Sequence, residues 1–172
     1  MMFDKINVVQ IVKDHLDTLK NDNTKKPGND DYFIFLILPL VLSTALLYFE
    51  IFLSEGAINI IITTLSILVG LLFNVIVLIF DIIKRDSSIK LKNRILKQLL
   101  SNISFTILTS IVAIIFTLLT FIDIFFLKIF FEGVVYFLLF LFLFTVLMII
   151  KRMYILFVNE IDEIDMKQNK DE

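Results

Sequence analysis

Cysteine is absent from this sequence of 172 residues, and histidine occurs once, at position 15. The lack of cysteine excludes disulfide bonds and thiolate ligands, although it says little about the compartment. A metal site needs several ligands and nothing near His15 is arranged as one, so we expect a solvated or interfacial histidine. The sequence contains no nucleophile-and-base pair, no glycine-rich phosphate loop and no zinc spacing. We therefore expect no enzyme, no cofactor and no bound metal.

An excess of charge is also missing. The formal net charge is −2, which gives no reason to expect direct nucleic-acid binding. Hydrophobic residues make up 58% of the chain, and the mean hydropathy is +0.91. Soluble domains contain about 45–50% apolar residues, and the apolar residues here form runs of about 18 or more. This pattern is typical of a membrane protein, whose first apolar run would act as the insertion signal because the charged N-terminus is a poor signal peptide.

The apolar runs predict an all-α polytopic membrane protein with four transmembrane helices, at about residues 32–54, 57–83, 103–126 and 133–150. The second run would be about 40 Å long as a helix, enough to cross a bilayer core of about 30 Å with some tilt. Pro39 predicts a kink or an opened turn in the first run. The fourth run is rich in phenylalanine and poor in polar groups, so we expect it to face lipid. Together the runs form a transmembrane domain over residues 32–153.

Three segments lie outside these runs. Residues 1–31 read as a cytosolic amphipathic helix over residues 3–20 followed by a linker, and residues 154–172 as an acidic helical tail. The tail carries an apolar seam that we expect to dock on the basic segment 84–100 or on a partner, formed by Tyr154, Phe157 and Ile161. The basic segment contains six cations: Lys84, Arg85, Lys90, Lys92, Arg94 and Lys97. They either contact anionic lipid headgroups or a partner, or only fix the topology of the chain in the membrane.

Positive charge is distributed very unevenly between the two sides of the predicted membrane domain. Of 16 Lys and Arg residues, all but Lys128 lie in residues 1–31, 84–100 or 151–172. Cytoplasmic loops of membrane proteins carry the excess of Lys and Arg. We therefore expect a multi-pass protein of the bacterial inner membrane, with both termini in the cytoplasm.

Small and polar residues form a stripe about 80° wide on each of two predicted spans. On the second span these residues are Asn59, Thr63, Ser66, Gly70, Asn74 and Asp81; on the third they are Asn102, Thr106, Thr109, Ala113, Thr117 and Thr120. Such stripes either pack membrane helices closely or line a water-filled pore. Gly70 and Ala113 lie near the middle of their antiparallel spans, so we expect the two helices to cross closely there.

Two pieces of the sequence, LLFNVIVLIFD (residues 71–81) and NISFTIL (residues 102–108), resemble small four-span membrane proteins of bacterial anti-phage defence operons. The nearest is the membrane subunit of the Kiwa system. That resemblance implies a homo-oligomer that works with a separate DNA-binding cytosolic protein. In the same setting, an ion-conducting effector of the Hailong type is a rival. Neither family supplies a functional residue that can be placed on this sequence.

These observations favour an oligomeric inner-membrane protein that acts as a membrane sensor, or as an anchor for a cytosolic partner, in anti-phage defence. The partners expected are membrane lipids, further copies of the chain and a cytosolic protein. Two alternatives stay open. The chain could form a channel that depolarises the cell, or it could be a structural subunit of a larger membrane complex.

Overall fold

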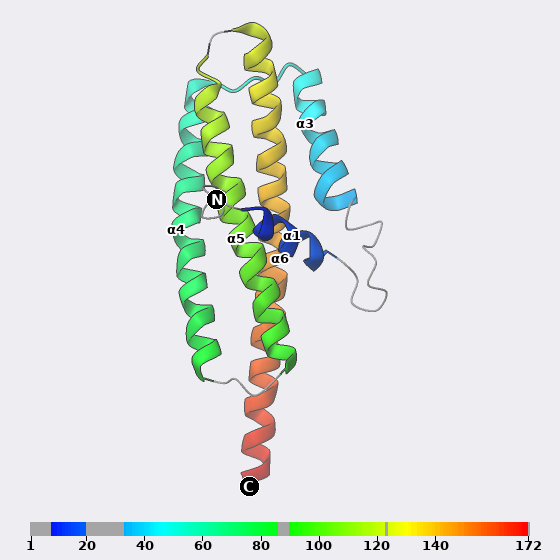
Figure 1. The fold of residues 1–172 in the computed structure, drawn as a ribbon, viewed down its shortest axis with the longest axis vertical. Helices are drawn as coiled ribbons and strands as arrows, with labels where there is room; N and C mark the ends of the chain where they lie inside the picture. Colours follow the sequence, from blue (N-terminus) through cyan, green and yellow to red (C-terminus); the bar gives the residue numbers. More distant parts are fainter. Residues whose placement is uncertain (1–7, 20–32, 86–89, 123, 172) are drawn as a thin grey trace, which may run out of the picture.

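The computed structural model describes residues 8–19, 33–85, 90–122 and 124–171, and the regular secondary structure of these residues is all helical (Figure 1). The elements in chain order are α1 (Val9–Thr18), the π-helical turn η2 (Phe33–Ile37), α3 (Leu38–Tyr48), α4 (Glu55–Arg85), α5 (Lys90–Leu119) and α6 (Phe125–Asp171). The linker predicted at residues 21–31 lies outside the described residues. So do the side chains of Lys84, Arg85, Lys90 and Lys92.

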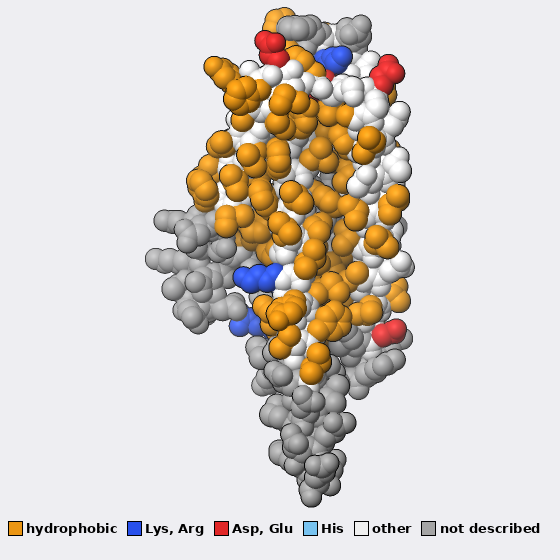
Figure 2. Space-filling view, turned by 180° about the vertical axis from the view of Figure 1, so that it is seen from behind, with side chains coloured by type: hydrophobic (Ala, Val, Ile, Leu, Met, Phe, Trp, Pro, Cys, Tyr) orange, Lys and Arg blue, Asp and Glu red, His pale blue; other side chains and the backbone are white. Residues whose placement is uncertain are grey.

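Among the described residues, three helices are long and apolar enough to cross a membrane, over Glu55–Asp81, Arg94–Leu119 and Phe126–Val158. The fourth apolar helix, Phe33–Tyr48, is shorter, at about 24 Å for a rise of 1.5 Å per residue. Hydrophobic side chains cover the middle of the visible face in Figure 2, whereas acidic and basic side chains lie toward its two ends. This distribution is that of a membrane protein, since charged groups are costly in the hydrocarbon region.

The four larger helices form a row in the order α4, α5, α6, α3 (Figure 1). Among the described residues, α4 contacts α5 alone, whereas α6 contacts α5, α3 and η2. In the most hydrophobic 18-residue stretch of each helix, only 11% is buried for α4, compared with 44% for α5 and 28% for α6. The expectation that the phenylalanine-rich fourth run would be the main lipid-facing helix is therefore wrong. In this chain α4 has the most open surface, because it packs at one edge of the row.

The first apolar helix is short because its C-terminus is closed by a capping motif. The Ile51 N–H donates to the Leu46 carbonyl at 3.0 Å, and the Glu50 N–H donates to the Leu47 carbonyl at 3.0 Å. Glu50 has a φ of 54°, the left-handed conformation that such a cap requires and that glycine usually supplies. The helix thus stops at Tyr48 instead of extending to residue 54 as predicted. At its other end η2 lies just before Pro39, which lacks the N–H that an α-helix would use there.

Helix α4 starts immediately after this connection because Ser54 caps it. The Ala57 N–H donates to Ser54 Oγ at 3.2 Å, and the Ile58 N–H donates to the Ser54 carbonyl at 2.9 Å. The boundaries of the next helices also differ from those predicted. The basic stretch from Lys90 continues as the first turns of α5 instead of forming a separate interfacial helix, and α6 begins at Phe125, eight residues before the predicted span.

Heptad spacing accounts for the helix packing. The described residues of α4 that are buried against the rest of the chain recur every seven positions, at Ile58, Leu65, Leu72 and Ile79. Four buried apolar residues of α6 have the same spacing: Val135, Phe142, Ile149 and Leu156. A seven-residue repeat keeps one seam of a helix against a neighbour that crosses at a shallow angle. The core lies along this seam, where Leu96, Leu99 and Ile103 of α5 fill the space between the outer helices.

Candidate functional site

Helix α1 lies across the row and is fixed to two of its helices by a buried polar cluster, which we call the α1 junction: His15, Thr18, Asn102 and Arg152. Nδ1 of His15 donates to Oδ1 of Asn102 over 2.9 Å, and this oxygen also accepts from the Thr18 hydroxyl at 2.8 Å. Nη2 of Arg152 donates to the Thr18 carbonyl at 2.9 Å. One short N-terminal helix is thereby bonded to α5 and to α6.

Two aromatic rings enclose the histidine of the junction. The Phe105 ring lies parallel to the imidazole with centroids 3.8 Å apart, and Phe35 of η2 approaches edge-on at 6.2 Å. His15 is only 2% exposed. The expectation of a solvated or interfacial histidine is therefore wrong. It failed because it rested on the absence of neighbouring metal ligands, which does not decide burial: His15 and Leu19 are buried, whereas Val9 and Leu16 are exposed.

Burial changes the acid–base behaviour of this residue. Removal from water lowers the pKa of His15 from 6.5 to about 4; the hydrogen bond to Asn102 opposes the shift, and the positive charge of Arg152 adds to it. Because Oδ1 of Asn102 can only accept, Nδ1 of His15 carries the single proton of the neutral ring. The docked form of α1 thus requires an uncharged histidine, which links its docking to pH.

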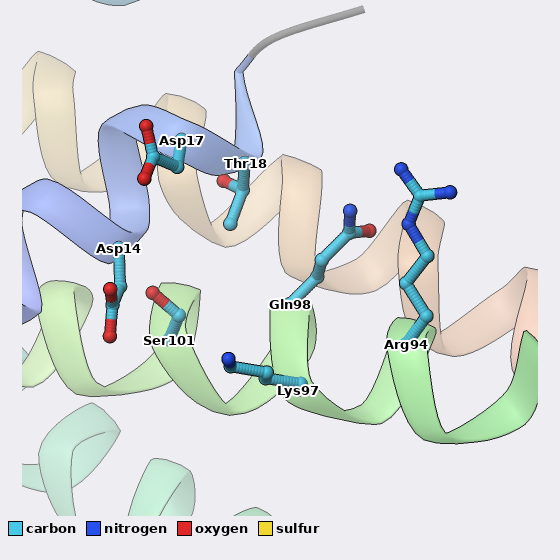
Figure 3. Close-up of a pocket in the computed structure, with 7 residues that line it drawn as sticks. All are labelled: Asp14, Asp17, Thr18, Arg94, Lys97, Gln98 and Ser101. Carbon is cyan, nitrogen blue, oxygen red and sulfur yellow. The ribbon is translucent and has the colours of Figure 1, made fainter. Parts of the chain in front are cut away.

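Beside the junction lies a polar cavity of about 220 Å³ between α1 and the first turns of α5 (Figure 3). Asp14 and Asp17 of α1 form one side, and Arg94 and Lys97 of α5 form another. Both cations were predicted as lipid or partner contacts. Their acidic neighbours are on α1, whereas the sequence suggested acidic neighbours on the tail. Opposite charges balance one another here, so the cavity has no bias toward a ligand of one sign.

The end of the row near the α3–α4 connection holds a second buried polar group that sequence reasoning missed. Glu132 of α6 is 0% exposed, and its carboxylate lies close to the backbone of Leu53. One turn later, the Tyr136 hydroxyl donates to the Ile51 carbonyl at 2.9 Å and so attaches the α3–α4 connection to α6. The predicted spans 103–126 and 133–150 had left Glu132 in the connection between them. Extension of α6 back to Phe125 places it inside the protein.

The two predicted stripes face different surroundings. The α5 stripe is buried in the chain, with Asn102, Thr106, Ala113 and Thr117 all at 0% exposure. Its hydroxyls bond to carbonyls of their own helix, as from Thr106 to Asn102 at 2.7 Å and from Thr117 to Ala113 at 2.7 Å. Hydroxyls satisfied in this way can be buried at little cost. The α5 stripe therefore packs inside the protein.

The α4 stripe points out of the chain. Asn59, Thr63, Ser66, Gly70, Asn74 and Asp81 are all exposed. At 100° per residue, the centre of this stripe lies about 150° around the helix from the heptad positions that contact α5. A Cβ atom built on Gly70 would have no atom within 4 Å. The predicted close crossing of Gly70 and Ala113 is therefore wrong, since the leucine and isoleucine seam of α4 makes that contact instead.

The apolar seam of the tail is also unburied. Tyr154 is 69% exposed, Phe157 45% and Ile161 58%, although Leu156 on another face of the same helix is 4% exposed and belongs to the core. The expected docking of this seam onto the basic segment is not formed among the described residues. Its apolar area is left available for another molecule.

The geometry offers two external surfaces, on α4 and on the tail, and one internal polar junction. Within the described part of the chain, no group of three or more His, Asp or Glu side chains could hold a metal ion. Comparisons with protein-family models, with curated proteins and with solved structures found no match to this chain.

Proposed function

We propose that this chain is a self-associating multi-pass protein of the bacterial inner membrane that acts as a membrane sensor, or as an anchor for a cytosolic partner. The observation that carries the proposal is the outward-facing stripe of α4. Polar groups that face lipid are costly, and small residues allow membrane helices to approach closely. The occupant that fits is α4 of a second copy, because a two-fold axis would bring the same stripe to both sides of the contact.

The tail is the proposed site for a cytosolic partner. Helix α6 contains 47 residues, about 70 Å at 1.5 Å per residue, which is more than twice the thickness of a bilayer core. Its C-terminal part would therefore extend beyond the membrane. Tyr154, Phe157 and Ile161, at the end of the apolar stretch and just past it, would form an apolar contact surface next to the α1 junction at Arg152.

The topology belongs to the same proposal. With both termini in the cytoplasm, Phe33–Tyr48 would cross the membrane as a fourth, short span. Support comes from the distribution of Lys and Arg, of which Lys128 alone would be on the outer side. A helix of about 24 Å is shorter than a bilayer core, and local thinning of the bilayer or the Glu50–Ser54 connection would cover the difference.

Self-association is tested by comparing two leucine substitutions on α4. Gly70→Leu fills the centre of the stripe, while Thr64→Leu, also exposed, lies off the stripe on the same helix. In mild detergent, we expect Gly70→Leu to dissociate the oligomer and Thr64→Leu to leave it intact. No atom within 4 Å would meet a Cβ at Gly70 inside the chain, so the monomer should tolerate the change. An intact Gly70→Leu oligomer would refute the proposal.

A pore is the second candidate function, favoured by the same outward stripe. Copies arranged around an axis would turn the polar groups of Asn59, Thr63, Ser66 and Asn74 toward water. In that arrangement Gly70→Leu would keep the oligomer and block conduction, and a membrane-potential dye would report the loss of depolarisation. A role in anti-phage defence rests on the resemblance to the Kiwa membrane subunit alone, and a structural subunit of a larger complex is the remaining alternative.

A further inference from the structure

A second cavity, of about 560 Å³, opens on the side of α6 opposite to the core, between α1, η2, α5 and α6. Its size falls within the range of about 300–1,000 Å³ typical of small-ligand pockets. Apolar side chains form most of its wall, among them Phe35 of η2 and Phe144, Leu147 and Met148 of α6. The polar cavity of Figure 3 adjoins it on the α1 and α5 side, and Thr18 and Gln98 line both.

The charged residues that line this cavity, among those the structure describes, all have one sign. Lys151 and Arg152 are the only charged residues among the described residues that line it, and no carboxylate accompanies them. The cavity of Figure 3, by contrast, is lined by two aspartates and two cations. Lys151 is exposed, so its ammonium group can reach a ligand without leaving a buried position. The apolar cavity therefore favours a ligand with a negative group.

The order of the lining residues along α6 matches the order of groups in a phospholipid. Phe144, Leu147 and Met148 come first, and Lys151 with Arg152 follow one turn later, toward the end of the apolar span. The phosphate of a membrane lipid lies at the interface and its acyl chains lie deeper. Basic residues at the interface attract anionic headgroups.

We propose that this cavity binds an anionic phospholipid, with the headgroup phosphate at Lys151 and Arg152 and an acyl chain along Phe144 and Leu147. By the distribution of positive charge, the lipid would come from the cytoplasmic leaflet. Thr18 and Leu19 of α1 complete the wall, and Arg152 also bonds to the Thr18 carbonyl. The bound lipid would thus contact the docked helix α1. This inference does not depend on self-association.

The absence of tryptophan from the chain makes a direct test possible. Leu147→Trp would introduce a single fluorescent reporter in the wall of the cavity. The full chain is reconstituted in phosphatidylcholine vesicles that contain a minor fraction of brominated phosphatidylglycerol or brominated phosphatidylcholine. We expect brominated phosphatidylglycerol to quench the reporter more strongly at equal content. Adding Lys151→Gln should lower its apparent affinity about fivefold, the effect expected for one basic residue.

Two controls separate a specific site from general lipid contact. Ile67→Trp places the reporter on the exposed surface of α4, where both brominated lipids should quench equally. Lys97→Gln removes a cation from the other cavity and should leave the Leu147→Trp response unchanged. Equal quenching by both lipids at Leu147→Trp, no quenching by either, or the same loss with Lys97→Gln would overturn the proposal.

A second measurement covers the case in which Leu147→Trp fails to fold. Native mass spectrometry of the unsubstituted chain should show phosphatidylglycerol retained more strongly than phosphatidylcholine, and Lys151→Gln should remove that preference. Equal retention of the two lipids by the unsubstituted chain would refute the inference independently of the reporter.

Discussion

The imidazole ring of His15 lies against the phenyl ring of Phe105, with centroids 3.8 Å apart and an angle of 3° between the planes. This contact joins the N-terminal helix α1 to the long apolar helix α5 through a residue whose pKa falls from 6.5 to about 4 when it is buried. Asn102 and Arg152 complete the enclosure from α5 and α6. The position of α1 should therefore depend on the protonation state of a single side chain.

Acidification should release α1. The pKa of His15 is 6.5 when the helix is undocked and about 4 when it is docked, so the undocked form takes up the proton first. Docking should be strongest above pH 6.5 and should weaken as the pH falls toward 4, by about 30-fold at pH 5. Hydrogen exchange of the Val9–Thr18 amides, corrected for the intrinsic pH dependence, measures this change.

The matched control is His15→Gln, which keeps a hydrogen-bond donor but does not titrate. Asp14 and Asp17 of α1, Arg94 and Lys97 of α5 and Lys151 and Arg152 of α6 are present in both proteins, so their own contributions cancel. The pH dependence should disappear in His15→Gln. Equal pH dependence in both proteins, or stronger protection of α1 at acid pH, would disprove the role of His15.

Replacing Glu50 by glycine should stabilise the connection between α3 and α4. A residue with a side chain in the left-handed conformation costs about 1–2 kcal/mol, and glycine avoids this cost while adding about 0.4–1 kcal/mol of unfolded-state entropy. The net gain should be a few tenths to about 1 kcal/mol in the free energy of unfolding. Thermal unfolding in detergent measures it, with Glu50→Ala as a control that keeps the strain. A loss of stability with glycine would contradict the capping role.

The exposed seam of the tail should matter for a partner and not for the fold. Replacing Tyr154, Phe157 and Ile161 by serine should leave membrane insertion and self-association unchanged, because all three are exposed. Cross-linking in cells should then show the loss of a cytosolic protein from the tail. In contrast, Leu156→Ser should lower stability by about 2–5 kcal/mol, since Leu156 is 4% exposed and packs in the core. Unchanged cross-linking of the triple variant would exclude the seam from partner binding.

Reporter fusions should place both short connections on the outer side. Fusions after Ser54 and after Ile122 should report the periplasm, and fusions after Arg85 and after Asp171 should report the cytoplasm. These positions follow the helix ends of the structure and avoid Glu132, which is buried in α6. A cytoplasmic signal after Ser54 would mean that Phe33–Tyr48 does not span the membrane.

The sequence predicted the all-helical class and three of the apolar helices, because long apolar runs admit few other structures. It failed to identify which face of α4 packs. The polar stripe was visible in the sequence, but the heptad of Ile58, Leu65, Leu72 and Ile79 was hidden among other apolar residues. In a chain this hydrophobic, the residues that contact a neighbouring helix and the residues that face lipid are both apolar. The contact face is therefore recognised by the spacing of its residues along the helix and not by their polarity.

The α1 junction could not be predicted for another reason. His15 and Asn102 are separated by 87 positions in the sequence. In addition, His15 is not one of the apolar residues from which the buried face of its helix would be predicted. The sequence placed Glu132 outside the fourth apolar helix because the predicted start of that helix, residue 133, is eight residues later than the observed start of α6 at Phe125. Helix ends depend on local capping, as at Glu50, and are poorly marked where every neighbouring residue is apolar.

The central claim is that α4 of one copy meets α4 of another along the stripe. Because the chain has no cysteine, single substitutions give an unambiguous cross-linking pattern in native membranes. Oxidation should produce a covalent dimer with Thr63→Cys, Gly70→Cys and Asn74→Cys. It should produce little or none with Thr64→Cys, Leu71→Cys and Leu78→Cys, which are also exposed but lie on another face. Equal cross-linking on both faces, or cross-linking at the second set alone, would contradict the claim.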